Sequence, residues 1–176
     1  ANVAVTDTNA IILGASTVSG TYDVTAGGAI TDSGTQEITG VTTIAAGSGN
    51  DITLDTSTNN FAAAVVITSG NNVAITDEDA IDLGASTVSG TYDVTAGGAI
   101  TDSGTQEITG VTTIAAGSGN DITLDTSTNN FAAAVVITSG NNVAITDEDA
   151  IVLGASTVSG TYGITAAGAV TDTGAL

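Results

Sequence analysis

The sequence predicts an all-β fold, a parallel β-solenoid in the form of a right-handed β-helix, on three observations. Residues 13–81 are identical, position for position, to residues 83–151, so the chain carries a 70-residue repeat. Short runs such as Val73, Ala74, Ile75 alternate in polarity and size with a period of two, the pattern of a half-buried strand. Corners rich in Gly and Asn separate these runs, no segment has the helical period, and Pro is absent.

The 70-residue unit is predicted to contain three coils, with lengths of 20, 23 and 27. Cuts before Val18, Ile38 and Phe61 give three rows that begin with the similar heptapeptides VSGTYDV, ITGVTTI and FAAAVVI. Each row continues through a corner of small residues into a second strand, AITD, DITLD or VAITD. Coils of this length with two or three short strands are typical of a solenoid, so the rows are expected to stack on one another.

This division places apolar side chains in ladders along the axis. One predicted ladder contains Val24, Ile44, Ile67 and Val94, and another contains Ile30, Ile52, Ile75 and Ile100. Residues 1–176 are expected to form a single continuous solenoid segment, part of a longer repetitive chain or filament. Tandem β-sandwiches are the alternative, but a 70-residue unit is short beside the roughly 100 residues of an immunoglobulin-like sandwich, and Asn-Gly and Asp-Gly hairpin signals are missing.

The charge of the chain restricts its partners. Nineteen acidic residues and no Lys, Arg or His give a net charge of -19. Nucleic acid and anionic membrane surfaces are therefore unfavourable partners, whereas cations are favourable ones. The longest apolar run, residues 61–67, is about a third of the roughly 20 residues that a membrane-spanning helix needs, so no membrane insertion is expected.

Several phrases of the sequence are similar to those of a known family. The stretches GNNVAITDEDAIDLGASTVSG, DVTAGGAITDSG and TTIAAGSGNDITLD resemble the repeats of filamentous-haemagglutinin-like giant surface adhesins of Gram-negative bacteria. The resemblance covers essentially the whole chain, although the absence of bases and the perfect identity of the two long copies depart from it. It implies a right-handed β-helical stalk that is secreted to the bacterial cell surface, with roles in adhesion, surface coating or biofilm.

The expected function is therefore structural. The chain is predicted to be the rod or stalk of a bacterial surface adhesin, or the building block of a surface filament or biofilm matrix. Terminal coils of such a rod expose unpaired strand edges, and the sequence shows no obvious cap, so we expect self-association, either end to end or lateral. Host or cell-surface glycans are a second expected class of partner.

One acidic stretch suggests a metal site. Calcium takes six to eight oxygen ligands, and the repeated TDEDA turn supplies consecutive carboxylates. The candidate calcium ligands are Asp77, Glu78, Asp79, Asp147, Glu148 and Asp149. A calcium-dependent carbohydrate-binding β-helix module is accordingly the alternative function, against the simpler interpretation of a solvated acidic loop. No other cofactor is expected.

No catalytic residue is predicted. Lyases built on β-helices need a base such as Arg or Lys, and the chain has neither, nor a His or a Cys nucleophile. Pairs of carboxylates leave a glycan hydrolase as a third hypothesis. The duplication of every candidate in the second copy favours a periodic structure over a single active site.

Overall fold

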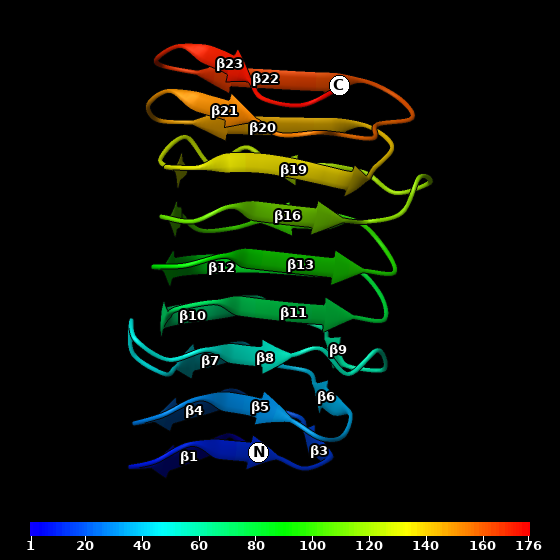
Figure 1. Cartoon of the computed structure of the whole chain (residues 1–176). Coiled ribbons are helices and arrows are strands. Elements are labelled where there is room, and N and C mark those ends of the chain that lie inside the picture. Colours follow the sequence, from blue (N-terminus) through cyan, green and yellow to red (C-terminus); the bar gives the residue numbers. More distant parts are fainter.

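The computed structural model describes all 176 residues as a rod of stacked coils (Figure 1). It contains 23 strands and no helix, and every pairing between strands is parallel. The predicted parallel β-solenoid is thus confirmed. Tandem β-sandwiches are excluded, because their strands would pair antiparallel. No helix is present that could cross a lipid bilayer.

Two sheets run along the rod on opposite sides, each with nine strands in line. The sheet at the back of Figure 1, the back sheet, contains β1 (Val3–Asp7), β4 (Tyr22–Ala26), β7 (Thr42–Ala45), β10 (Val65–Gly70), β12 (Ile81–Val88), β14 (Ile100–Asp102), β17 (Ile122–Leu124), β20 (Val143–Asp147) and β22 (Tyr162–Ala166). The front sheet contains β2 (Ile11–Leu13), β5 (Ile30–Asp32), β8 (Ile52–Leu54), β11 (Val73–Asp77), β13 (Tyr92–Ala96), β16 (Thr112–Ala115), β19 (Ala134–Ser139), β21 (Ile151–Leu153) and β23 (Val170–Asp172).

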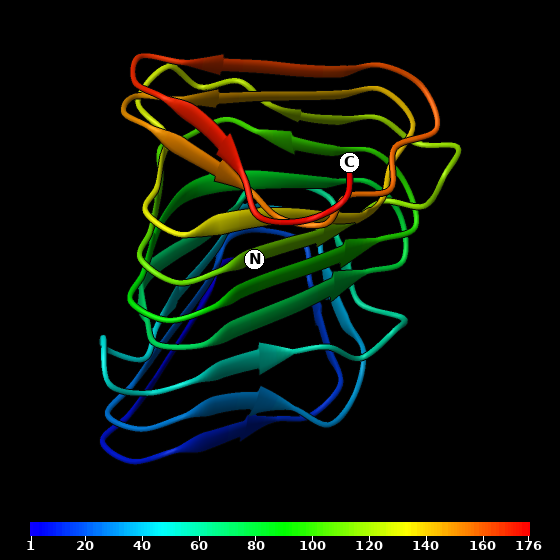
Figure 2. The ribbon, with the colours of Figure 1, turned by 45° about the horizontal axis from the view of Figure 1, so that its top comes forward.

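Shorter strands extend three levels of each face. A small third sheet follows the front strands of the first three levels and contains β3 (Ser16–Val18), β6 (Gln36–Ile38) and β9 (Asn60–Phe61). Two further strands, β15 (Gln106–Ile108) and β18 (Asn130–Phe131), stack in the same way on the second half of β12. In Figures 1 and 2 the chain runs to the right along the front, passes to the back and returns to the left while it rises, which makes the solenoid right-handed.

The predicted division into coils with lengths of 20, 23 and 27 is correct for the first two rows and wrong for the third. Val24 pairs with Ile44, and Ile44 pairs with Ile67, as predicted. However, Ile67 then pairs with Ser86, and Val94 pairs with Ile75 in the front sheet.

The second predicted ladder fails at the same row. Ile30 pairs with Ile52 as predicted, but Ile52 pairs with Val73, and Ile100 pairs with Ile81. The reason is that residues 78–80 form a tight corner between β11 and β12, so the third row contains one coil and half of the next. We call the passage along one face a half-coil; the 70-residue repeat contains seven of them.

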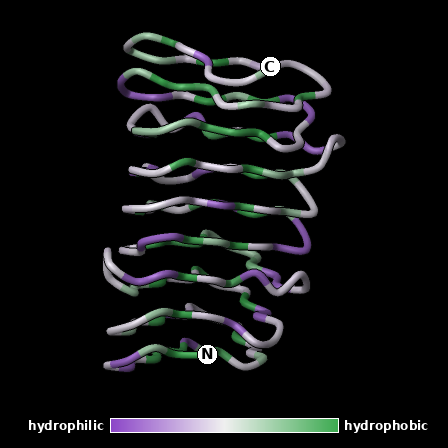
Figure 3. The backbone as a smooth tube through the Cα atoms, viewed as in Figure 1, coloured by the Kyte–Doolittle hydropathy of each residue, from purple (hydrophilic) through white to green (hydrophobic).

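The core lies between the two sheets as one cluster of 35 buried residues. Strands such as β4 and β13 alternate strictly between buried and exposed positions, which the period-two pattern predicted. Figure 3 shows hydrophobic stretches along the strands of successive levels and hydrophilic stretches at several of the turns. Two corners need glycine: Gly47 has a φ of 83°, and a Cβ on Gly40 would collide with the Gly20 carbonyl oxygen of the coil beneath.

Candidate functional site

Two of the predicted calcium ligands are buried and already hold backbone amides. Asp77 is 2% exposed; its Oδ1 accepts a hydrogen bond from the Asp79 amide and its Oδ2 accepts one from the Phe61 amide, both at 2.8 Å. Asp147 does the same, with the Asp149 amide at 2.8 Å and the Phe131 amide at 2.9 Å. These carboxylates close the corner that follows their strand and bind it to the neighbouring coil, so both have a structural role.

Burial raises the pKa of the Asp77 carboxyl above its ordinary value. The hydrogen bonds from the Phe61 and Asp79 amides oppose this rise, and the negative charges of Asp79 and Glu78 add to it. The fold therefore keeps a carboxylate where burial disfavours its charge, because the two amides would otherwise lack an acceptor.

The other four candidates are exposed. Glu78, Asp79, Glu148 and Asp149 lie on turns at the surface. Asn60 donates long hydrogen bonds of 3.4 Å from its amide nitrogen to Glu78 Oε1 and Asp79 Oδ2. No group of three or more acidic side chains converges in a geometry that could hold a metal ion. Calcium binding at these turns stays a prediction.

The two acidic turns do not lie together. Residues 78–80 connect the front strand β11 to the back strand β12, whereas residues 148–150 connect the back strand β20 to the front strand β21. They therefore occupy opposite edges of the rod. A repeat of three whole coils would place the two copies on one side, whereas the seven half-coils of the structure place them on opposite edges.

A second acidic position is part of a polar ladder along the edge. Asp51 Oδ1 accepts hydrogen bonds from the Asn72 amide at 3.1 Å and from the side chain of Asn71 at 3.0 Å. One coil further, Asn72 Oδ1 accepts a bond from the Thr91 amide at 3.1 Å. The backbone hydrogen bond from Asn72, followed by the side-chain bond from Asn71, lowers the pKa of the Asp51 carboxyl. The ladder joins three successive coils.

A buried polar ladder, of which sequence reasoning missed Gln36, lies at the corners between the front strands and the third sheet. Gln36 and Asn59 are fully buried. Asn59 Oδ1 accepts from the Gln36 amide at 2.9 Å, while its Nδ2 donates to Asp32 Oδ2 at 2.6 Å. Gln36 Nε2 donates to the carbonyl oxygens of Gly14 and Gly34 at 2.8 and 2.7 Å. The available signal was the phrase QEI, in which alternation places Gln36 on the same inward face as Ile38.

The tyrosines face the interior. Tyr22 and Tyr92 are 4% and 1% exposed, and Tyr162 is half-buried in the last level. The Tyr92 hydroxyl has no hydrogen-bond partner. Burial raises its pKa to about 12, and the neighbouring Ser86 hydroxyl, which donates to the Gly84 carbonyl oxygen, offsets this rise only in part. The surface accordingly offers no fully exposed tyrosine ring on which a sugar could stack.

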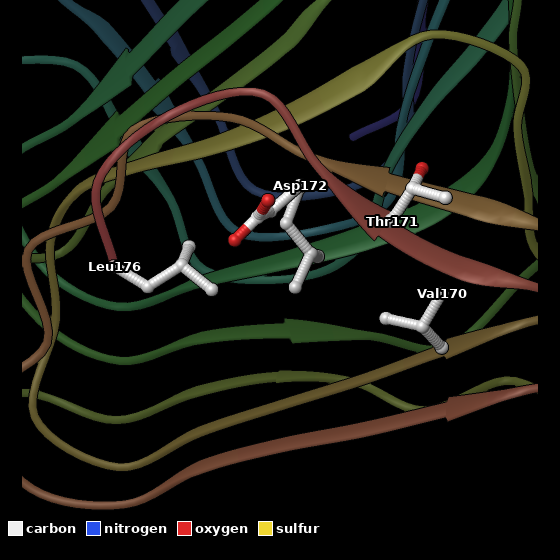
Figure 4. Close-up of a pocket in the computed structure, with 5 residues that line it drawn as sticks. Val170, Thr171, Asp172 and Leu176 are labelled. Atoms are coloured by element: carbon white, nitrogen blue, oxygen red, sulfur yellow. The ribbon is translucent and has the colours of Figure 1, made fainter.

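The hollow of the molecule is its open C-terminal end. A cavity of about 540 Å³ is lined by Leu153, Val170, Thr171, Asp172 and Leu176 (Figure 4). Val170 is 51% exposed and Leu176 is 61% exposed, although the equivalent of Val170 in the previous repeat, Ile100, is fully buried. The hollow is thus formed by core positions of the last level, above Leu153 and its neighbours in the rod interior.

Comparison with known proteins identifies the repeat. A family model described as repeats of unknown function (DUF5649) matches residues 1–68, 70–138 and 140–176. The chain belongs to this repeat family. The three matched segments follow the 70-residue period, so the family unit coincides with the repeat of seven half-coils. Searches of curated proteins and of solved structures gave no match.

Proposed function

We propose that this chain is a segment of an extracellular rod, acting as the stalk of a bacterial surface adhesin or as the building block of a surface filament. The observation that carries the proposal is a ladder of coils that continues unbroken through nine levels. A rod of this kind grows by addition of coils, because each coil contacts only its neighbours. The phrase-level resemblance to giant surface adhesins supports the bacterial surface as its location.

The polar groups of the chain support a structural role. The buried acidic and amide side chains described above accept or donate hydrogen bonds between coils, so they stabilise the fold. The single cavity lies at the last level of the core and is lined by three apolar residues among five. Repetition of this pattern extends a rod and creates no unique cleft.

The two ends of the chain are suited to each other. Val3 donates its amide to the Thr21 carbonyl oxygen of the next coil, and the Asp7 carbonyl oxygen accepts from the Gly27 amide. Because alternate residues of a parallel strand direct their groups to opposite sides, the amides of Ala4 and Thr6 point away from the chain. At the other end, β22 and β23 leave the corresponding edge unpaired.

A second copy placed on that edge would pair β1 with β22 and β2 with β23, in the register that β1 and β4, and β2 and β5, already use within one chain. Nine levels at about 4.8 Å would then give a subunit spacing of about 43 Å. Each copy carries a net charge of -19, so assembly should strengthen as salt screens the repulsion.

The test is electron microscopy and light scattering of residues 1–176 at low and high salt. We expect filaments with a spacing of about 43 Å at high salt. The double variant A4P/T6P removes two outward-pointing amides without removing a bond within the chain, and should stay monomeric. The matched variant A4G/T6A keeps both amides and should assemble. A parent chain that remains monomeric under all conditions would contradict the filament.

The proposed location has its own test. An antibody against the chain should label intact cells of the source bacterium as strongly as lysed ones. Labelling that appears only after lysis would contradict an extracellular rod, whatever the assembly experiment shows.

The second candidate function is a calcium-dependent carbohydrate-binding module. The observation in its favour is the exposed pair Glu78 and Asp79, repeated as Glu148 and Asp149. Added Ca²⁺ should raise the melting temperature of the rod, with Mg²⁺ as the matched control. The variant E78Q/D79N/E148Q/D149N should lose the shift. A melting temperature that Ca²⁺ leaves unchanged would remove this candidate.

A further inference from the structure

Equivalent residues of successive repeats lie on opposite faces of the rod. Tyr22 belongs to β4 of the back sheet, and Tyr92, one repeat later in an identical sequence context, belongs to β13 of the front sheet. Their neighbours correspond: Tyr22 pairs with Thr42, and Tyr92 pairs with Thr112. The local structure is therefore the same in both repeats, and only the face has changed.

The third copy returns to the first face. β22, which begins with Tyr162, lies in the back sheet with β4, and β20 lies there with β1. Two full repeats are thus needed before a strand regains its original side. This behaviour follows from the seven half-coils of each repeat, because after an odd number of half-coils the next repeat begins on the face opposite to the one on which the previous repeat began.

We infer that each 70-residue repeat turns the rod by half a turn, so that the number of repeats sets the side on which every later element faces. One repeat advances the axis by three and a half coils, about 17 Å at about 4.8 Å per coil. Gain or loss of a single repeat moves everything beyond it to the opposite face. Gain or loss of two repeats preserves the facing.

The exposed surface shows the consequence for binding partners. On the back face, the outward column of Asp23, Thr43 and Val66 runs over three neighbouring strands. The identical column of Asp93, Thr113 and Val136 runs over the front face. A partner that recognises this column therefore meets it again on the opposite side of the rod, one half-turn further along. An array of such repeats is two-sided and can bridge two copies of the same partner.

The half-turn is built into the local packing. Each half-coil contributes its own inward residues and its own corner, and the corner at residues 78–80 is fixed by the two hydrogen bonds to Asp77. The inference rests on these pairings and is independent of the proposed role at a cell surface.

Nitroxide labels at introduced cysteines test the inference directly, since the chain has no cysteine of its own. In the intact chain, T25C and T87C place two labels on the back face, three coils or about 14 Å apart. T25C and T95C place equivalent labels on opposite faces, pointing away from each other. We expect a clearly longer distance for the second pair; equal distances would overturn the half-turn.

Removal of one repeat gives the sharper test. Deletion of residues 83–152 joins Asp82 to Leu153 and restores the native phrase IDLGAS. In the intact chain Thr165 pairs with Thr146 on the back face. In the deletion variant it should lie beside Thr76 on the front face, as Thr95 does in the intact chain.

Strong dipolar coupling is therefore expected in the deletion variant for T76C/T165C and weak coupling for T68C/T165C, because Thr68 lies in the back strand β10. The reverse pattern would show that a repeat contains a whole number of coils and would overturn the inference. Should the shortened chain fail to fold, the comparison of T25C/T87C with T25C/T95C in the intact chain still decides the question.

Discussion

The middle of the rod and its C-terminal end contain equivalent residues in different environments. Ile100 in the middle is fully buried, whereas Val170, its equivalent in the last level, is 51% exposed. Tyr92 is 1% exposed, and Tyr162 is only half-buried. The difference shows that a coil buries its residues mainly through the coil stacked on it. Stability in such a rod is therefore a property of neighbouring pairs of coils.

The largest expected effect is a core truncation in the middle of the rod. Ile100→Ala should lower the free energy of unfolding by about 2–5 kcal/mol, because it leaves a cavity between fixed coils. Val170→Ala, at the equivalent position of the open end, should cost less than about 0.5 kcal/mol. Urea denaturation of both variants at low salt, where repulsion between the acidic chains opposes assembly, measures the contrast. Equal losses would mean that the terminal coil is covered in solution, as assembly into filaments requires.

A somewhat smaller effect is expected at alkaline pH. Tyr92 has its pKa raised to about 12 by burial, whereas it would titrate near 10 in the unfolded chain. Its contribution to stability is therefore fully present below pH 10 and is lost as the pH rises toward 12, by about 3 kcal/mol at about 1.4 kcal/mol per pKa unit.

Tyr92→Phe should abolish most of this loss, and it should stabilise the rod slightly at pH 7, because the hydroxyl has no hydrogen-bond partner. Tyr162→Phe is the matched control in the last level. Tyr162 is half-buried there, and burial raises its pKa as well. Urea denaturation between pH 8 and 12 compares the two. An unchanged alkaline transition in Tyr92→Phe would contradict the role of this residue.

The third comparison concerns equivalent carboxylates in an inner level and in the first level. Asp77→Ala should cost about 1–3 kcal/mol, since the amides of Phe61 and Asp79 lose their acceptor. Asp7, its equivalent at the N-terminal end, accepts only from the Asn9 amide at 2.8 Å. Asp7→Ala should therefore cost less than about 1 kcal/mol. Thermal melting distinguishes them, and equal costs would show that the bond between coils adds nothing.

The smallest effect is expected at acid pH, where two carboxylates act in opposite directions. The pKa of Asp77 is raised, so its contribution is full below the unfolded value of 3.8 and is lost as the pH rises through the folded pKa. The pKa of Asp51 is lowered, so its contribution is present above 3.8 and is lost as the pH falls through the folded pKa.

Asp51→Ala should consequently destabilise the rod by less than about 1 kcal/mol at pH 7, because the hydrogen bonds of Asp51 are exposed to solvent. The cost should be smaller still at a pH well below 3. Denaturation at pH 2.5, 4 and 7 measures the trend. A cost that grows as the pH falls would have the wrong sign for a carboxyl held ionised by Asn71 and Asn72.

The candidate site was predictable only in part. The sequence identified Asp77 and Asp79 as an acidic turn, but it could not show that the Asp77 carboxylate accepts the amide of Phe61, 16 residues earlier. Buried Gln36 was missed for the same reason, because a polar residue on an inward face acquires its partners from the coils above and below. Hydrogen bonds between coils are long-range contacts, and no short stretch of sequence contains both partners.

The sequence by itself determined that the chain is a parallel β-solenoid, because alternation, glycine corners and the 70-residue identity are all local or repetitive signals. It also placed the first two coils correctly, from Val24 to Ile44 to Ile67. Only the tertiary structure decided that residues 78–80 form a corner and that a repeat contains seven half-coils. The physical reason is that all coils share one cross-section, so the path must turn wherever the sheet beneath it turns, whatever length the row appears to have in the sequence.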